Sequence, residues 1–216
     1  MRGIFSVDSP VIRALIKFFD CICVSILWLL FSLPVVTMGT ASAALYTTVY
    51  KYLRRDEGHL WDTFWTAFKG NLRRSTLVWL AALAVLALLT VDALVFRTLK
   101  LAGSPLGGAY WVVLALICAA ATWTAYLSAY AARFSGGAKD VLRFAFVLMA
   151  AHPVKALEVF LPILAGAVLL LTGLQWIAIV PAAVCWVNSI VLEKVFLLHM
   201  RPEDAEKTQA DDIDRQ

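Results

Sequence analysis

The sequence predicts an all-α membrane protein, with six membrane-embedded helices arranged as three helical hairpins. Of the 216 residues, 62% are hydrophobic and only 16% are charged, whereas a soluble domain carries about 25% charged residues. The mean hydropathy is +0.80. Several uncharged runs approach the length of about 20 residues that a helix needs to cross a bilayer. Together these properties exclude an ordinary water-soluble globule.

Four membrane spans can be read directly from the apolar runs. They cover residues 75–95, 110–132, 157–174 and 176–198. A helix rises about 1.5 Å per residue, so each run is long enough to cross a hydrocarbon core of about 30 Å.

The region 21–50 is uncharged throughout but is interrupted by Pro34 and Gly39. As one helix it would be about 45 Å long, which is too long for a straight span. Pro34 lacks a backbone donor and biases Leu33 away from the helical conformation. We therefore expect two short or tilted helices, 21–33 and about 40–52, which brings the total to six. The alternative is five spans plus one re-entrant or short helix.

The distribution of Lys and Arg favours six helices, with both termini in the cytoplasm. In this arrangement only Arg97 and Lys100 lie outside, and cytoplasmic loops are the ones that collect basic residues. A cleavable leader is the competing interpretation of the basic N-terminal arm and the apolar run 21–36. Asp8 and Asp20 in the arm argue against it.

An amphipathic stretch precedes each hairpin, and the strongest covers residues 60–74. Its aromatic residues Trp61, Phe64, Trp65 and Phe68 follow helical spacing. We expect a cytoplasmic interfacial helix whose aromatic face anchors the protein in lipid. The alternative is that this face packs inside the protein. Weaker stretches of the same kind begin near Ser9 and Asp140, which indicates three similar units.

Two groups of polar residues inside apolar segments are candidate sites for a polar cavity. The first is the broken hairpin, where backbone groups need partners at membrane depth; its alternative is a tight helix contact through Gly39. The second lies on one face of the last helix; its alternative is that Glu193 forms an ion pair near the interface. The groups are Pro34, Thr37, Gly39, Thr40 and Ser42, and Asn188, Ser189 and Glu193.

No pattern in the sequence indicates catalysis. A phosphate-binding loop, metal-ligand spacing and a nucleophile elbow are all missing from it. We therefore expect no enzymatic activity, no catalytic residue, no cofactor and no metal. His59, His152 and His199 are far apart in the sequence and would share a metal only if the fold gathered them.

The basic residues also lie at helix ends and form no continuous face, so we expect the lipid bilayer as a partner and no nucleic acid. Residues 1–200 are predicted to form one transmembrane bundle. Residues 201–216 are predicted to form a disordered, acidic cytoplasmic tail because they contain few apolar residues. The sequence specifies no oligomeric state.

Several segments resemble the YesL family of bacterial integral membrane proteins. They are Leu33-Pro34-Val35-Val36-Thr37, Ala43-Ala44-Leu45-Tyr46, Phe64, and Phe68-Lys69-Gly70-Asn71-Leu72. The resemblance extends over nearly the whole chain, by motif in the first half and mainly by hydropathy in the second. It implies a multi-pass protein of the bacterial plasma membrane, often encoded near systems for carbohydrate uptake and sensing, with no catalytic residues to assign.

The expected function is therefore that of an accessory or interaction component of a membrane transporter or sensor. The alternative is a small transporter or channel for a polar solute. A continuous polar tunnel between the two candidate sites would favour transport, whereas a solid core with exposed apolar grooves would favour partner binding.

Overall fold

The computed structural model describes residues 10–134 and 136–199, and seven α-helices account for most of them. The helices are α1 (Pro10–Ser32), α2 (Met38–Thr48), α3 (Leu60–Leu101), α4 (Ala109–Arg133), α5 (Ala138–Ala151), α6 (Pro153–Thr172) and α7 (Val180–Leu197). Short 3-10 helices cover Val35–Thr37, Pro105–Gly108 and Leu174–Ala178, and a π-helical segment, Val49–Arg54, continues α2. The all-α prediction is confirmed for these residues. The predicted acidic tail 201–216 lies outside them.

Five helical segments in the described part of the chain are long and apolar enough to span a membrane. They are Ile12–Ser32, Leu60–Leu101, Pro105–Arg133, Pro153–Thr172 and Val180–Leu197. The four spans predicted from the apolar runs lie largely within the last four. Helix α2 is much shorter, so whether it makes a sixth crossing stays a prediction.

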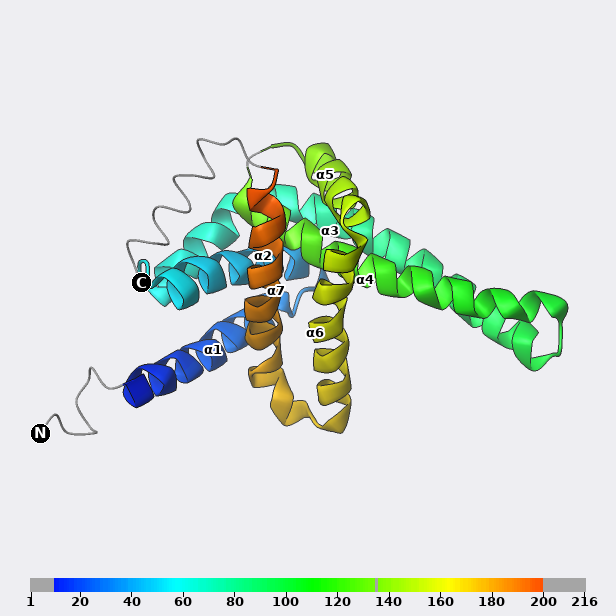
Figure 1. Cartoon of the computed structure of the whole chain (residues 1–216), viewed down its shortest axis with the longest axis horizontal. Coiled ribbons are helices and arrows are strands. Elements are labelled where there is room, and N and C mark those ends of the chain that lie inside the picture. The colour runs from blue at the N-terminus through cyan, green and yellow to red at the C-terminus, as the bar shows by residue number, and fades with distance from the viewer. Residues whose placement is uncertain (1–9, 135, 200–216) are drawn as a thin grey trace, which may run out of the picture.

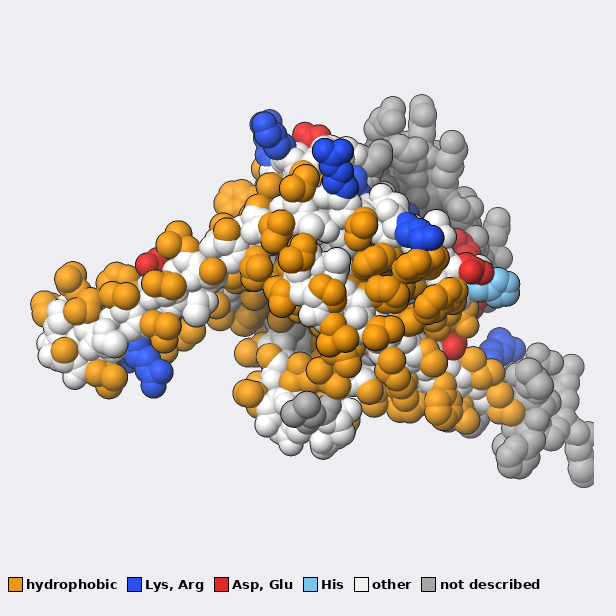
Figure 2. Space-filling view, turned by 180° about the vertical axis from the view of Figure 1, so that it is seen from behind, with side chains coloured by type: hydrophobic (Ala, Val, Ile, Leu, Met, Phe, Trp, Pro, Cys, Tyr) orange, Lys and Arg blue, Asp and Glu red, His pale blue; other side chains and the backbone are white. Residues whose placement is uncertain are grey.

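The hairpins diverge from a shared core (Figure 1). Helices α3 and α4 run side by side to one edge of the molecule, α6 and α7 point in another direction, and α1 points in a third. Buried side chains from α2, α4, α5 and α7 meet in the centre, among them Tyr46, Tyr126, Val141, Leu192 and Phe196. Seen from behind, the arm that α3 and α4 form is covered with hydrophobic side chains (Figure 2).

The amphipathic stretch 60–74 is not a separate interfacial helix. It forms the first part of α3, which continues without interruption to Leu101. Nothing in the stretch breaks a helix: it contains no Pro, and a single Gly costs only about 1 kcal/mol. The first stretch is likewise continuous with α1. Only the third is a helix of its own, α5, because Pro153 starts a new helix directly after His152.

The break predicted at Pro34 is present. Helix α1 ends at Ser32, and Pro34 adopts an extended conformation with φ −74° and ψ 113°. The Thr37 hydroxyl lies 2.7 Å from the carbonyl oxygen of Phe31 and 2.9 Å from that of Pro34, and it can donate to either. This hydroxyl therefore satisfies backbone acceptors that the helix end leaves open.

Gly39 lets α2 approach α3 closely. A Cβ atom built on Gly39 would overlap the side chain of Trp79 on α3. The indole nitrogen of Trp79 in turn donates to the carbonyl oxygen of Val35 at 2.7 Å. Thr40 adds a second link, because its hydroxyl oxygen lies 3.1 Å from that of Thr76. The turn after Pro34 is thus fixed to the middle of α3.

Arg74 joins α3 to the end of α4. Its guanidinium donates to the carbonyl oxygens of Phe134 at 2.9 Å and Gly136 at 3.2 Å, and also to that of Ala131. Asn71 orients the guanidinium by accepting a further hydrogen bond at 2.8 Å. Carbonyl groups at a helix C-terminus have no partner within the helix and carry partial negative charge, so a cation caps them well.

Candidate functional site

A buried polar cluster lies where α2, α4 and α7 meet. Glu193 on α7 is only 5% exposed. The hydroxyl of Tyr46 on α2 donates to its Oε1 at 2.9 Å, and Nε of Arg133, the last residue of α4, lies 3.3 Å from its Oε2. A buried carboxylate needs such partners because desolvation without them is costly. The predicted pairing of Glu193 is therefore present, but its partners come from distant helices.

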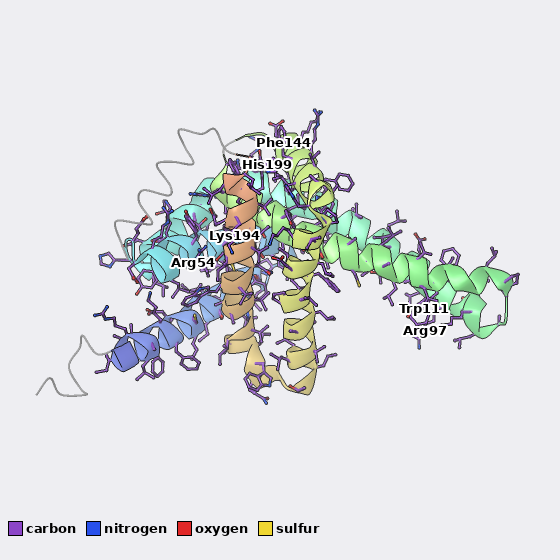
Figure 3. The ribbon with its side chains drawn as sticks, viewed as in Figure 1. Arg54, Arg97, Trp111, Phe144, Lys194 and His199 are labelled. Carbon is purple, nitrogen blue, oxygen red and sulfur yellow. The ribbon has the colours of Figure 1, made fainter. Side chains whose placement is uncertain are left out.

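Three arginines surround the ring of Tyr50, in the π-helical segment after α2. The guanidinium carbons of Arg54, Arg55 and Arg133 lie 5.7, 4.6 and 4.4 Å from the ring centroid. Figure 3 shows Arg54 beside α7, where it donates to the backbone oxygen of Ser189 at 3.2 Å and to its hydroxyl at 3.3 Å. Three positive charges from two parts of the chain thus gather around Tyr50.

A cavity of about 250 Å³ lies between α2, α3, α4, α6 and α7. Gly39 and Ser42 of the broken hairpin line it, and so does Asn188 of the last helix. The fold therefore brings residues of both predicted polar sites to one space. The walls are mostly apolar, and within the described residues the buried Oδ1 of Asn188 has no hydrogen-bond partner.

Another cavity, of about 170 Å³, also borders Tyr46. Its lining consists of Tyr46, Thr47, Tyr50, Lys51, Ala132 and Arg133. Tyr46 borders both cavities and is held in place by its hydrogen bond to Glu193. The two spaces are distinct in this conformation, one largely apolar and the other cationic.

The remaining predicted site residues have structural contacts. Pro34, Thr37 and Thr40 belong to the turn and to its joint with α3 and do not line the larger cavity. The Ser189 hydroxyl donates to the carbonyl oxygen of Trp186 at 2.7 Å and receives Arg54. The candidate hairpin site is thus divided between a packing joint and one wall of a cavity.

The expected lipid anchor requires correction for two of its four aromatic residues. Phe64 and Phe68 are buried, with ring centroids 5.6 and 4.9 Å from that of Phe31 on α1. Trp61 is 52% exposed and remains available to lipid, while Trp65 is partly buried. The face is covered because α1 and α2 fold back over the start of α3.

Tyr46, Tyr50 and Arg133 were not identified as site residues from the sequence. The two tyrosines repeat at one-turn spacing, as do Tyr126 and Tyr130, a pattern that is typical of an interfacial aromatic belt. In the structure Tyr46, Tyr50 and Tyr126 are buried. The signal that could have identified them is Glu193 itself, because a carboxylate in an apolar helix requires a donor and a cation from elsewhere in the chain.

The fold gathers two of the three histidines. The rings of His152, between α5 and α6, and His199, after α7, lie 5.1 Å apart. No group of three or more His, Cys, Asp or Glu side chains suited to a metal ion occurs within residues 10–134 and 136–199.

Comparison with protein families gives a match to part of the chain. Residues 21–93 match the model of DUF624, a family of proteins of unknown function. The match begins inside α1 and ends in the outer part of α3, so it includes the Pro34 break and Tyr46 but neither Arg133 nor Glu193. No curated protein and no solved structure matches the chain. Residues 21–93, about a third of the chain, are thus similar to the DUF624 family.

Proposed function

We propose that this chain is a non-enzymatic accessory or interaction component of the bacterial plasma membrane that binds another membrane protein. The observation behind the proposal is the α3–α4 arm, which projects from the core (Figure 1). Large apolar side chains are exposed on both of its helices, including Leu88 and Val91 on α3 and Trp111 and Val112 on α4. The rest of the described chain leaves these outer faces uncovered.

The composition of the arm suits a helical partner as well as lipid. Lipid tails are as apolar as leucine, so helices associate in membranes where small residues allow their backbones to approach. Ala84 and Ala87 are exposed on α3 next to Leu88. They offer a shallow surface on which a second transmembrane helix can pack.

The topology that best accompanies this role has six membrane-embedded helices and both termini in the cytoplasm. Its support is the Lys and Arg distribution, together with the course of the chain: the start of α1 and the start of α3 lie toward the same side of the molecule (Figure 1). The resemblance to the YesL family supports a bacterial plasma membrane and a partner in carbohydrate uptake or sensing.

Photo-crosslinking in native membranes tests the interaction. A photoreactive amino acid at Leu88 should give a discrete protein adduct, identified by mass spectrometry as a transporter or sensor subunit. The same probe at Val168, exposed on α6, serves as the matched control and should give mainly lipid adducts. Lipid adducts alone at both positions would refute the proposed partner surface.

A second function, binding and transport of a small polar solute, is favoured by the larger cavity alone. Ser42 and Asn188 face one space from two helices, and the amide oxygen of Asn188 lacks a partner in the described chain. In reconstituted vesicles Asn188→Ala should then reduce uptake of a solute mixture, whereas Thr90→Val on the outer arm should not. Equal uptake by both variants would eliminate this alternative.

A further inference from the structure

The smaller cavity has the composition of an anion site. Of its six lining residues, Lys51 and Arg133 are cationic, none is acidic, and Tyr46, Thr47 and Tyr50 carry hydroxyl groups. Lys51 is exposed, so the space opens to the surface on its side. The Tyr46 and Thr47 hydroxyls already donate to Glu193 and to the carbonyl oxygen of Ala43, so the donors that this site offers to phosphate oxygens are the Lys51 ammonium and the Arg133 guanidinium.

The positive charge around this smaller cavity is only partly compensated. Arg133 is paired with Glu193. Arg54 donates to two uncharged oxygens of Ser189, and within the described residues neither Arg54 nor Lys51 has a carboxylate partner within ion-pair distance. One carboxylate, that of Glu193, thus lies among the positive charges of Arg54, Arg55 and Arg133, and Lys51 has no direct ion pair of its own within the described residues.

The local backbone is unusual in the same place. Val49–Arg54 is π-helical, and it supplies Tyr50, Lys51 and Arg54. π-Helical turns are rare, are less favourable than α-helix and frequently occur at functional sites. Here the wider turn places Lys51 on the rim of the cavity and Arg54 against α7.

We infer that the cavity between Lys51 and Arg133 binds a phosphate group. Basic pockets between helices on the cytoplasmic side of a membrane bind anionic headgroups, and the basic residues of this chain mark that side. The same donors fit the headgroup phosphate of an anionic phospholipid and free phosphate. This site is independent of the arm proposed to bind a protein partner.

The test compares the full chain purified in neutral detergent with two charge-matched variants. Native mass spectrometry should show phosphatidylglycerol binding more tightly than zwitterionic phosphatidylcholine. Lys51→Gln should weaken this binding about fivefold, the effect of one basic group near an anionic headgroup. Lys69→Gln removes the same charge from α3, where the lysine lies over Trp65 and outside the cavity, and should leave the affinity unchanged.

Inorganic phosphate distinguishes the two sources. If the ligand is a lipid, millimolar phosphate should not displace phosphatidylglycerol. If it is free phosphate, phosphate should displace the lipid and its own binding should depend on Lys51. Equal losses of phosphatidylglycerol affinity in the Lys51→Gln and Lys69→Gln variants would overturn the inference. So would the absence of any preference for phosphatidylglycerol over phosphatidylcholine together with no binding of inorganic phosphate.

Discussion

At the scale of single residues, the decisive feature is that Glu193 is buried with its partners already in place. Breaking a buried ion pair by removing one partner leaves the other charge uncompensated and costs more than the pair contributes. Arg133 is itself only 19% exposed at the side chain. Glu193 therefore compensates the positive charge of Arg133.

Glu193→Ala should lower the free energy of unfolding by about 3 kcal/mol, because it leaves Arg133 and the Tyr46 hydroxyl without their acceptor. Denaturant unfolding in detergent micelles measures the change. The control is Glu158→Ala, which removes a half-exposed pair to Lys155 at 2.8 Å and should cost about 1 kcal/mol or less. Similar losses in the two variants would contradict the buried role of Glu193.

Replacement by alanine should have opposite effects on stability at Gly39 and at Gly70. Gly39→Ala should destabilise the protein by about 1 to 3 kcal/mol, since its Cβ would overlap Trp79. Nothing lies within 4 Å of a Cβ on Gly70, so Gly70→Ala should raise helix stability by about 0.5 to 1 kcal/mol. Thermal unfolding of both variants provides the comparison, and a neutral Gly39→Ala would mean that α2 and α3 can separate at no cost.

At the scale of elements, Arg74 fastens the base of the arm that α3 and α4 form. It bonds three carbonyl oxygens at the end of α4 and in the connection to α5. A hydrogen bond to a charged group typically contributes about 1.5 to 3 kcal/mol to stability. The orientation of α4 relative to α5 therefore depends on a side chain of α3.

Arg74→Ala should increase amide hydrogen exchange in the connection between α4 and α5, because its carbonyl groups lose their cap. Arg73 is the adjacent arginine and is exposed, so Arg73→Ala removes the same charge without this contact. Exchange should remain unchanged in that variant. A uniform increase along the chain would instead indicate global destabilisation.

At the scale of the whole molecule, the proposed topology has a direct test. Single cysteines introduced at positions 4 and 212 should react with a membrane-impermeant reagent only after the cells are opened, because the proposed topology, which rests on the basic residues, has both termini inside. A cysteine at Ser104, between α3 and α4, should react from outside. Labelling of position 4 in intact cells would restore the five-span arrangement.

Local signals predicted much of this fold, and contacts between distant residues decided the rest. The apolar runs and Pro34 indicate the helices and the break, because length and a missing donor act locally. The burial of Phe64 depends on Phe31 of another helix, and no periodicity within 60–74 reveals which surface will cover it. The cluster of Tyr46, Arg133 and Glu193 likewise spans 147 positions between its first and last members.

The length of α3 has a mechanical consequence. Its 42 residues measure about 63 Å, roughly twice the hydrocarbon thickness. Because the helix is continuous, its two ends move together about the region of Trp79 and Arg74. Trp79 holds the turn before α2 there, and Arg74 holds the end of α4. A tilt imposed on the arm by the proposed partner should therefore swing the opposite end, carrying Trp61 and the buried Phe64 against α1.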